Sequence, residues 1–196
     1  MNKDCFVFIG DSLTYGYGVN KTNNWVENLN SLQSLNIINK GINGDTTTNM
    51  LNRFTEDVIS YYPKKIFIMG GTNDFLSNRP LNSVLENIEL MLKESLTITK
   101  DVLIGIPPII LKEDAKRLFM PSPTYDYCEN QLPLLRKSLI DLCTIYNVNF
   151  IDFYKITLEN YKSNIFIDGI HLNPRGQTLL LNEFITILKK ISDNNN

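Results

Sequence analysis

The sequence predicts an α/β protein in which parallel strands form an open sheet with helices on both faces. Short apolar runs alternate along the chain with longer stretches whose apolar residues recur at helical spacing. The connections between these apolar runs and helical stretches are short, which favours parallel strands joined by helical crossovers. Two of the short runs, at residues 5–9 and 102–106, contain no polar residue, as is typical of strands that are buried on both faces.

The strands are predicted from five apolar runs, in chain order at residues 5–9, 35–39, 65–69, 102–106 and 148–151. The first run ends at Gly10, the third at a pair of glycines and the fourth at a pair of prolines. Glycine and proline are unfavourable inside a strand, so they mark where each strand ends. The second run is the weakest of the five because it is the most polar.

The helices are predicted from apolar stripes at residues 24–32, 81–96, 131–146 and 174–191. The stripe over residues 81–96 is the clearest example of 3.6-residue spacing. Pro174 is placed as a first-turn proline, with Asn173 before it as the N-cap. Residues 107 to about 127 are predicted to form a long irregular loop, and residues 193–196 a solvated tail.

Composition predicts one domain over residues 1–196 and excludes several classes of partner. The chain is 43% hydrophobic and 20% charged, with a net charge of −2, and we find neither a repeat nor a linker. A nearly balanced charge gives no basis for binding nucleic acid or an anionic membrane. The expected partner is a small molecule, and the oligomeric state stays open.

The cysteines and the first apolar run indicate in which cellular compartment the protein is located. The chain has three widely spaced cysteines and no CxxC pair, which favours reduced thiols over disulfides or a zinc site. The run at residues 5–9 is too short for a signal peptide or a membrane span. We therefore expect a cytoplasmic protein that holds no metal.

Three residues form a candidate nucleophile, base and orienting acid. Ser12 lies two residues past the first predicted strand, and a serine hydroxyl needs a nearby base to become a nucleophile. The chain has one histidine, His171, which is therefore the candidate base. Asp168 precedes it by three residues on a tight turn, where a carboxylate can hold one ring nitrogen and direct the other outward.

Attack of a serine hydroxyl on an acyl carbonyl forms a tetrahedral intermediate, and its oxyanion needs hydrogen-bond donors. The candidates are the backbone N–H groups of Ser12 and Gly44 and the side-chain amide of Asn73, which follows the third strand. Each has a plainer interpretation, since Gly44 can simply form a turn and Asn73 can cap a helix. Asp11 and Asp74, beside these positions, are interpreted as residues that shape loops.

Four segments together resemble the GDSL esterases and lipases, in particular the SGNH hydrolases. In the family's order they are FIGDSLT at 8–14, NKGINGDT at 39–46, GTND at 71–74 and DGIHLN at 168–173. The resemblance implies a three-layer, flavodoxin-like fold with a five-stranded parallel sheet. It also implies hydrolysis of esters or thioesters through an acyl-enzyme, without a cofactor. Ser12, Asp168 and His171 match the family's triad, and Ser12, Gly44 and Asn73 its oxyanion donors.

The substrate is not determined by these segments. Carboxylic esters, thioesters, lysophospholipids and carbohydrate acetates are all compatible, as is acyl transfer to an acceptor other than water. A ligand-binding module without turnover is the alternative from another class. The candidate substrate-binding residues are Asp11, Leu13, Pro107, Pro108 and Ile109, with Tyr15 and Tyr17 beside the long loop as further parts of an acyl pocket.

Overall fold

Five parallel strands form the central sheet, which we describe from a computed structural model covering residues 4–33, 35–118 and 120–194. The strand order is β2-β1-β3-β4-β5, and every neighbouring pair is parallel. This confirms the predicted α/β class and all five predicted strands. Their bounds are β1 Cys5–Gly10, β2 Asn36–Gly41, β3 Lys65–Met69, β4 Val102–Ile106 and β5 Asn149–Asp152.

The sheet is buried on both faces because successive side chains of its strands point to opposite sides. In β1, Val7 and Ile9 join one hydrophobic core while Phe6 and Phe8 join the other. The same alternation continues through β3 and β4. Two apolar layers on one sheet explain why these strands are continuous apolar runs in the sequence.

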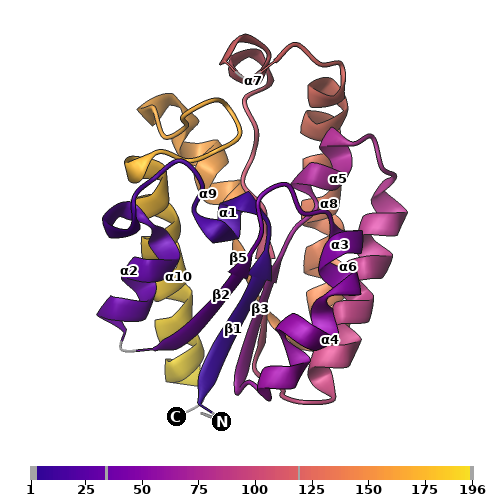
Figure 1. Cartoon of the computed structure of the whole chain (residues 1–196), viewed down its shortest axis with the longest axis vertical. Coiled ribbons are helices and arrows are strands. Elements are labelled where there is room, and N and C mark those ends of the chain that lie inside the picture. The colour runs from indigo at the N-terminus through magenta and orange to yellow at the C-terminus, as the bar shows by residue number, and fades with distance from the viewer. Residues whose placement is uncertain (1–3, 34, 119, 195–196) are drawn as a thin grey trace.

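Helices cover each face (Figure 1). The core on the first face receives side chains from α3 Thr47–Asn52, α4 Phe54–Asp57, α5 Thr72–Leu76, α6 Leu81–Leu96, α7 Lys112–Leu118 and α8 Thr124–Tyr146. The core on the second face receives them from α1 Ser12–Tyr15, α2 Trp25–Leu32, α9 Phe153–Asn160 and α10 Pro174–Asn194. Short 3-10 helices lie at η1 Lys21–Asn23, η2 Ile59–Tyr61 and η3 Tyr161–Ser163.

Trp25 ties the second core to the start of α1. Its ring is fully buried against four phenylalanines, Phe8, Phe67, Phe153 and Phe184. Its indole Nε1 donates a hydrogen bond of 2.9 Å to the carbonyl oxygen of Leu13. A buried indole N–H needs such a partner, so the packing of α2 also holds the turn that carries Ser12.

Two sequence predictions are corrected by the helices. The segment 107–127 is not one long loop, because α7 occupies Lys112–Leu118 and α8 already begins at Thr124; residue 119 lies outside the described residues. Burial of Tyr125 and Cys128 extends the apolar stripe of α8 in the N-terminal direction beyond residue 131. The predicted tail is also partly wrong: α10 continues to Asn194, and residues 195–196 lie outside the described part.

The N-terminus of α10 is confirmed. Asn173 Oδ1 accepts hydrogen bonds from the backbone N–H groups of Arg175 at 2.9 Å and Gly176 at 3.2 Å. These bonds satisfy donors that have no partner within the helix. The N-cap of α10, Asn173, therefore lies two residues after His171.

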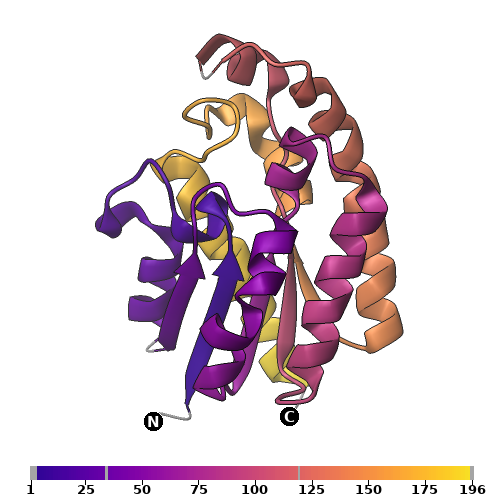
Figure 2. The same cartoon turned by 45° about the vertical axis from the view of Figure 1, so that its right-hand side comes forward.

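The strand order places the loops that follow β1, β2 and β3 close together at one edge of the sheet. From β1 the chain moves outward to β2 and then returns across β1 to β3, so β1 lies at the switch point. In open parallel sheets ligands bind beyond the carboxyl ends of the strands at such a point. Figure 2 shows the segments after β1 and β2 at the upper edge, opposite the start of β1 and the end of α10.

Candidate active site

Ser12 is the first residue of α1, directly beyond β1. Asp11 caps this short helix, because its Oδ1 accepts a 2.9 Å hydrogen bond from the N–H of Leu13. Gly10 permits the tight turn, since a Cβ there would lie 2.1 Å from Thr14 Oγ1. The Ser12 side chain is thus held at the end of the strand by the backbone on both sides.

The Ser12 hydroxyl meets an imidazole from the far end of the chain. Ser12 Oγ lies 3.0 Å from His171 Nε2, and His171 Nδ1 lies 2.7 Å from Asp168 Oδ2. The structure therefore brings the three predicted residues together in one hydrogen-bonded row. This arrangement allows the imidazole to take the serine proton while the carboxylate stabilises the resulting positive charge.

A tight turn over residues 166–172 holds the acid and the base. Phe166 and Leu172 pair across it, and Ile167 N–H donates to the carbonyl oxygen of His171 at 2.8 Å. Gly169 at the tip has a φ of +86°, and a Cβ there would lie 2.5 Å from Leu111 O. Only glycine meets both demands without strain.

The Asp168 carboxylate fixes the tautomer of the histidine. Burial alone would raise the pKa of Asp168, but hydrogen bonds from the His171 ring, His171 N–H and Ile170 N–H outweigh it, and the pKa is lowered. An ionised carboxylate at Nδ1 requires the ring proton on that nitrogen. The unprotonated Nε2 then faces Ser12 as an acceptor.

Gly44 and Asn73 border the same site. Gly44 has a φ of +80°, and within the described ranges neither its N–H nor that of Ser12 donates to a protein group. Asn73, in the first turn of α5, donates from Nδ2 to Asp45 O at 2.9 Å. The same nitrogen lies 3.4 Å from Asp11 Oδ2. The two backbone donors are free, whereas the amide of Asn73 already has protein acceptors.

A partly buried arginine, Arg53, holds the loop that carries Gly44 and Asp45. Arg53 binds the Asp45 carboxylate at 2.7 Å and that of Asp57 at 2.8 Å, and it also donates to Gly10 O at 3.1 Å. One guanidinium thereby joins the loop after β2 to the end of β1. Sequence reasoning missed Arg53, because it has no catalytic neighbour in the chain and its partners are set by the fold.

The candidate site opens into a pocket of about 320 Å³. Five residues predicted from the sequence line it, together with three others: Ser12, Tyr17, Gly44, Asn73 and His171, then Asn43, Leu76 and Ile170. The Tyr17 ring lies 4.4 Å from the His171 ring, centroid to centroid. Asn43, Leu76 and Ile170 were missed because a lining side chain without reactive chemistry leaves no signal in one sequence.

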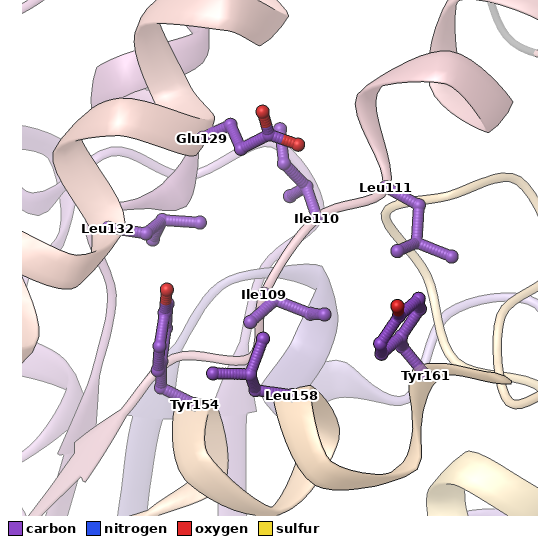
Figure 3. A pocket seen from close by; sticks show the side chains of 8 residues that line it. All are labelled: Ile109, Ile110, Leu111, Glu129, Leu132, Tyr154, Leu158 and Tyr161. Carbon is purple, nitrogen blue, oxygen red and sulfur yellow. The ribbon is translucent and has the colours of Figure 1, made fainter.

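The other predicted substrate-binding residues lie elsewhere. Asp11, Leu13, Pro107 and Pro108 are buried and do not line this pocket. Ile109 lines a second pocket of about 270 Å³ between α8 and α9 (Figure 3). Tyr15 borders a further pocket beside η1 and α2. The predicted acyl pocket is therefore not assembled around Ser12 from these residues.

The segment after β4 instead supports the turn that carries Asp168. Leu111 N–H donates to Gly169 O at 2.7 Å, and Ile109 N–H donates to Thr157 Oγ1 at 3.1 Å. Both bonds hold backbone that runs between the second pocket and the turn. The contribution of this segment to the site is thus structural support.

The three cysteines do not line the pocket beside Ser12. Burial raises the pKa of the Cys128 and Cys143 thiols to about 12, so neither is a nucleophile at neutral pH. All three cysteines are unpaired and buried. Across the described ranges, no cluster of three or more histidine, cysteine or acidic side chains is placed to hold a metal ion. Nor is any described helix both long and apolar enough to cross a membrane.

A hydrogen-bonded Ser-His-Asp row at the carboxyl edge of a parallel sheet is the type of site found in serine hydrolases. The fold and the site thus define the class of the protein as a hydrolase. The model of the GDSL-like Lipase/Acylhydrolase family matches residues 8–179. The chain belongs to this family and is an acylhydrolase or esterase.

Solved structures share the fold. A member of the lipolytic protein G-D-S-L family from Veillonella parvula is similar with a TM-score of 0.81 and 24% identity, over 94% of this chain and 97% of that one. A lipase/acylhydrolase from Enterococcus faecalis has a TM-score of 0.79 and 24% identity, over 95% of this chain and 96% of that one. The acetylxylan esterase Axe2 from Geobacillus stearothermophilus, solved as a catalytic mutant, has a TM-score of 0.77 and 19% identity, over 93% of each chain.

A curated relative covers less. The uncharacterized lipoprotein YqeF of Bacillus subtilis is 41% identical over 75 residues, which are 35% of this chain and 31% of the lipoprotein. The match thus spans about a third of either protein.

Proposed function

We propose that the protein hydrolyses carboxylic esters through an acyl-enzyme formed on Ser12. The observation that carries the proposal is the row Ser12 Oγ, His171 Nε2, Asp168 Oδ2, with separations of 3.0 Å between Ser12 and His171 and 2.7 Å between His171 and Asp168. His171 takes the hydroxyl proton as Ser12 attacks the acyl carbon, and then gives it to the leaving alcohol. Water, deprotonated by His171, releases the acid and regenerates Ser12.

The oxyanion of each tetrahedral intermediate is bound by the N–H groups of Ser12 and Gly44 and by the amide of Asn73. The two free backbone donors and the position of Asn73 on the same pocket support this assignment. Donors that are already oriented lower the barrier because they need no reorganisation as charge develops. Leu76 and Ile170 offer apolar surface in this pocket for the acyl group.

Labelling with a fluorophosphonate tests the proposal directly. The probe reacts with a serine that is activated by a base, so the wild-type protein should be modified at Ser12 and the Ser12→Ala variant should not. Peptide mapping by mass spectrometry locates the adduct. Absence of an adduct on the folded wild-type protein would favour a binding module without turnover.

Replacing Asn73 with alanine should lower kcat for an aryl ester by roughly 10² to 10³, with a smaller effect on KM, because the lost donor acts mainly in the transition state. Steady-state kinetics at one pH measures the change. Asn87→Ala is a matched control, since Asn87 Nδ2 binds Thr47 and Thr48 outside the site. An unchanged kcat in Asn73→Ala would remove Asn73 from the oxyanion site.

We propose a cytoplasmic location as well. Three unpaired cysteines fit a reducing compartment, where disulfides are rare. The partial match to a lipoprotein is the reason to test this location by cell fractionation. Recovery in the membrane fraction would overturn it.

A further inference from the structure

Asp11 is a buried carboxylate that touches one of the proposed oxyanion donors. It is 1% exposed. Its Oδ1 accepts from Leu13 N–H at 2.9 Å, and its Oδ2 faces Asn73 Nδ2 at 3.4 Å. The first bond makes Asp11 the cap of α1. The second contact is longer than a strong hydrogen bond, and the cap does not require it.

The amide of Asn73 has two hydrogens and three possible acceptors. One hydrogen is used by Asp45 O at 2.9 Å. The second is left between Asp11 Oδ2 and the pocket, where the oxyanion forms. An ionised Asp11 attracts this hydrogen toward itself, whereas a protonated Asp11 is a weaker acceptor.

We propose that Asp11 is a positioning residue that competes with the oxyanion for the second N–H of Asn73, so that full activity requires Asp11 in its protonated form. This inference rests on the proposed function. It adds to the site an acid whose ionisation slows the reaction.

The surroundings of Asp11 favour the protonated form. Burial raises the pKa of Asp11 to about 7, opposed by the Leu13 N–H and by His171, with Asp74 and Asp45 adding to the increase. Arg53 donates to the neighbouring Gly10 O, but its charge is paired with Asp45 and Asp57. Because an acid is neutral below its pKa, Asp11 is protonated below pH 7 and ionised above it. The rate should therefore fall as pH rises through about 7.

The pH dependence of kcat/KM for 4-nitrophenyl acetate, corrected for spontaneous hydrolysis, tests the proposal. The wild-type value should fall about tenfold between pH 6.5 and pH 9, since competition weakens a donor whose complete loss costs 10² to 10³. Asp11→Asn should remove this fall, because asparagine is neutral and can still accept from Leu13 N–H. If Asp11→Asn does not fold, Asp11→Ser retains a cap oxygen without charge and should behave in the same way.

Two further variants identify the route of the effect. Asp74→Asn is the matched control, because Asp74 is equally buried but accepts from Thr47 N–H and Oγ1. It should keep the fall, with the midpoint at a lower pH because the Asp74 carboxylate contributes to the raised pKa of Asp11. In an Asn73→Ala background, Asp11→Asn should change nothing, since the acceptor acts through Asn73. A fall that persists in Asp11→Asn, or one removed by Asp11→Asn in the Asn73→Ala background, would overturn the proposal.

NMR separates this inference from the proposed function. The side-chain NH₂ signals of Asn73 should shift with a midpoint near pH 7 in the wild-type protein and should not shift in Asp11→Asn. This readout needs no turnover. Absence of fluorophosphonate labelling with the NMR shift present would reject the esterase proposal alone, and labelling without the shift would reject the role of Asp11 alone.

Discussion

Replacing Ser12 with alanine should lower kcat for ester hydrolysis by about 10⁴ to 10⁶, because the variant has no oxygen that can form the acyl-enzyme. The other groups stay in place, since Ser12 contributes only its hydroxyl to the 3.0 Å contact with His171. Initial rates with an activated ester, measured against an enzyme-free blank, give the residual activity. The fold is checked by thermal unfolding.

Two comparisons sharpen this result. Ser31→Ala is the matched control, because the Ser31 hydroxyl is exposed on α2 and, among the described residues, bonds to Glu27 O alone, so the kcat of this variant should be that of the wild type. Adding His171→Ala to Ser12→Ala should cause little further loss, since nucleophile and base act as a unit. A Ser12→Ala variant that keeps a tenth of the activity would show that another group carries the reaction.

Replacing Asp168 with asparagine should lower kcat by about 10³ to 10⁴. The amide can still accept from the N–H groups of Ile170 and His171, so the turn is preserved. A neutral amide no longer holds the proton on His171 Nδ1, however, and the wrong tautomer presents N–H to Ser12. The measurement is kcat for the wild type and the variant at the same pH.

Asp141→Asn provides the control for removing one carboxylate, because Asp141 is exposed on α8, and it should have wild-type kcat. A decrease of less than tenfold in Asp168→Asn would contradict the orienting role. Stability provides a second readout. The lowered pKa of Asp168 stabilises the native state above its unfolded-state pKa, and this contribution is lost as pH falls through the folded-state pKa. Asp168→Asn should therefore be less stable than wild type at neutral pH and approach it in acid.

The long, periodic elements were predictable from the sequence, and the short ones were not. The stripe of α6 gives bounds identical to the prediction, Leu81–Leu96. Helices α1, α3, α4 and α5 have four to six residues, too few for a 3.6-residue period to be recognised. Helix α7 has the sequence KEDAKRL, and only Ala115 in it is buried, so it lacks an apolar stripe.

The candidate site shows the same division. Ser12, His171 and Asp168 could be named because their chemistry is specific and because the chain has a single histidine. The contacts among Asp11, Asn73 and Asp45 depend on which strands are neighbours, and one sequence does not reveal that. Ile109 was assigned to the wrong environment for a similar reason, since the segment after β4 turns toward α9 and not toward Ser12.

The nucleophile and its base are separated by 159 positions along the chain. During synthesis the hydroxyl leaves the ribosome long before the imidazole is made, so a growing polypeptide carries no activated serine. Any fragment that stops before residue 171 should be inert toward acyl groups, even if its first strands have paired. Hydrolysis is thus a property of the finished translation product, and its appearance in a cell-free reaction should lag behind the first antibody-detectable N-terminal segments.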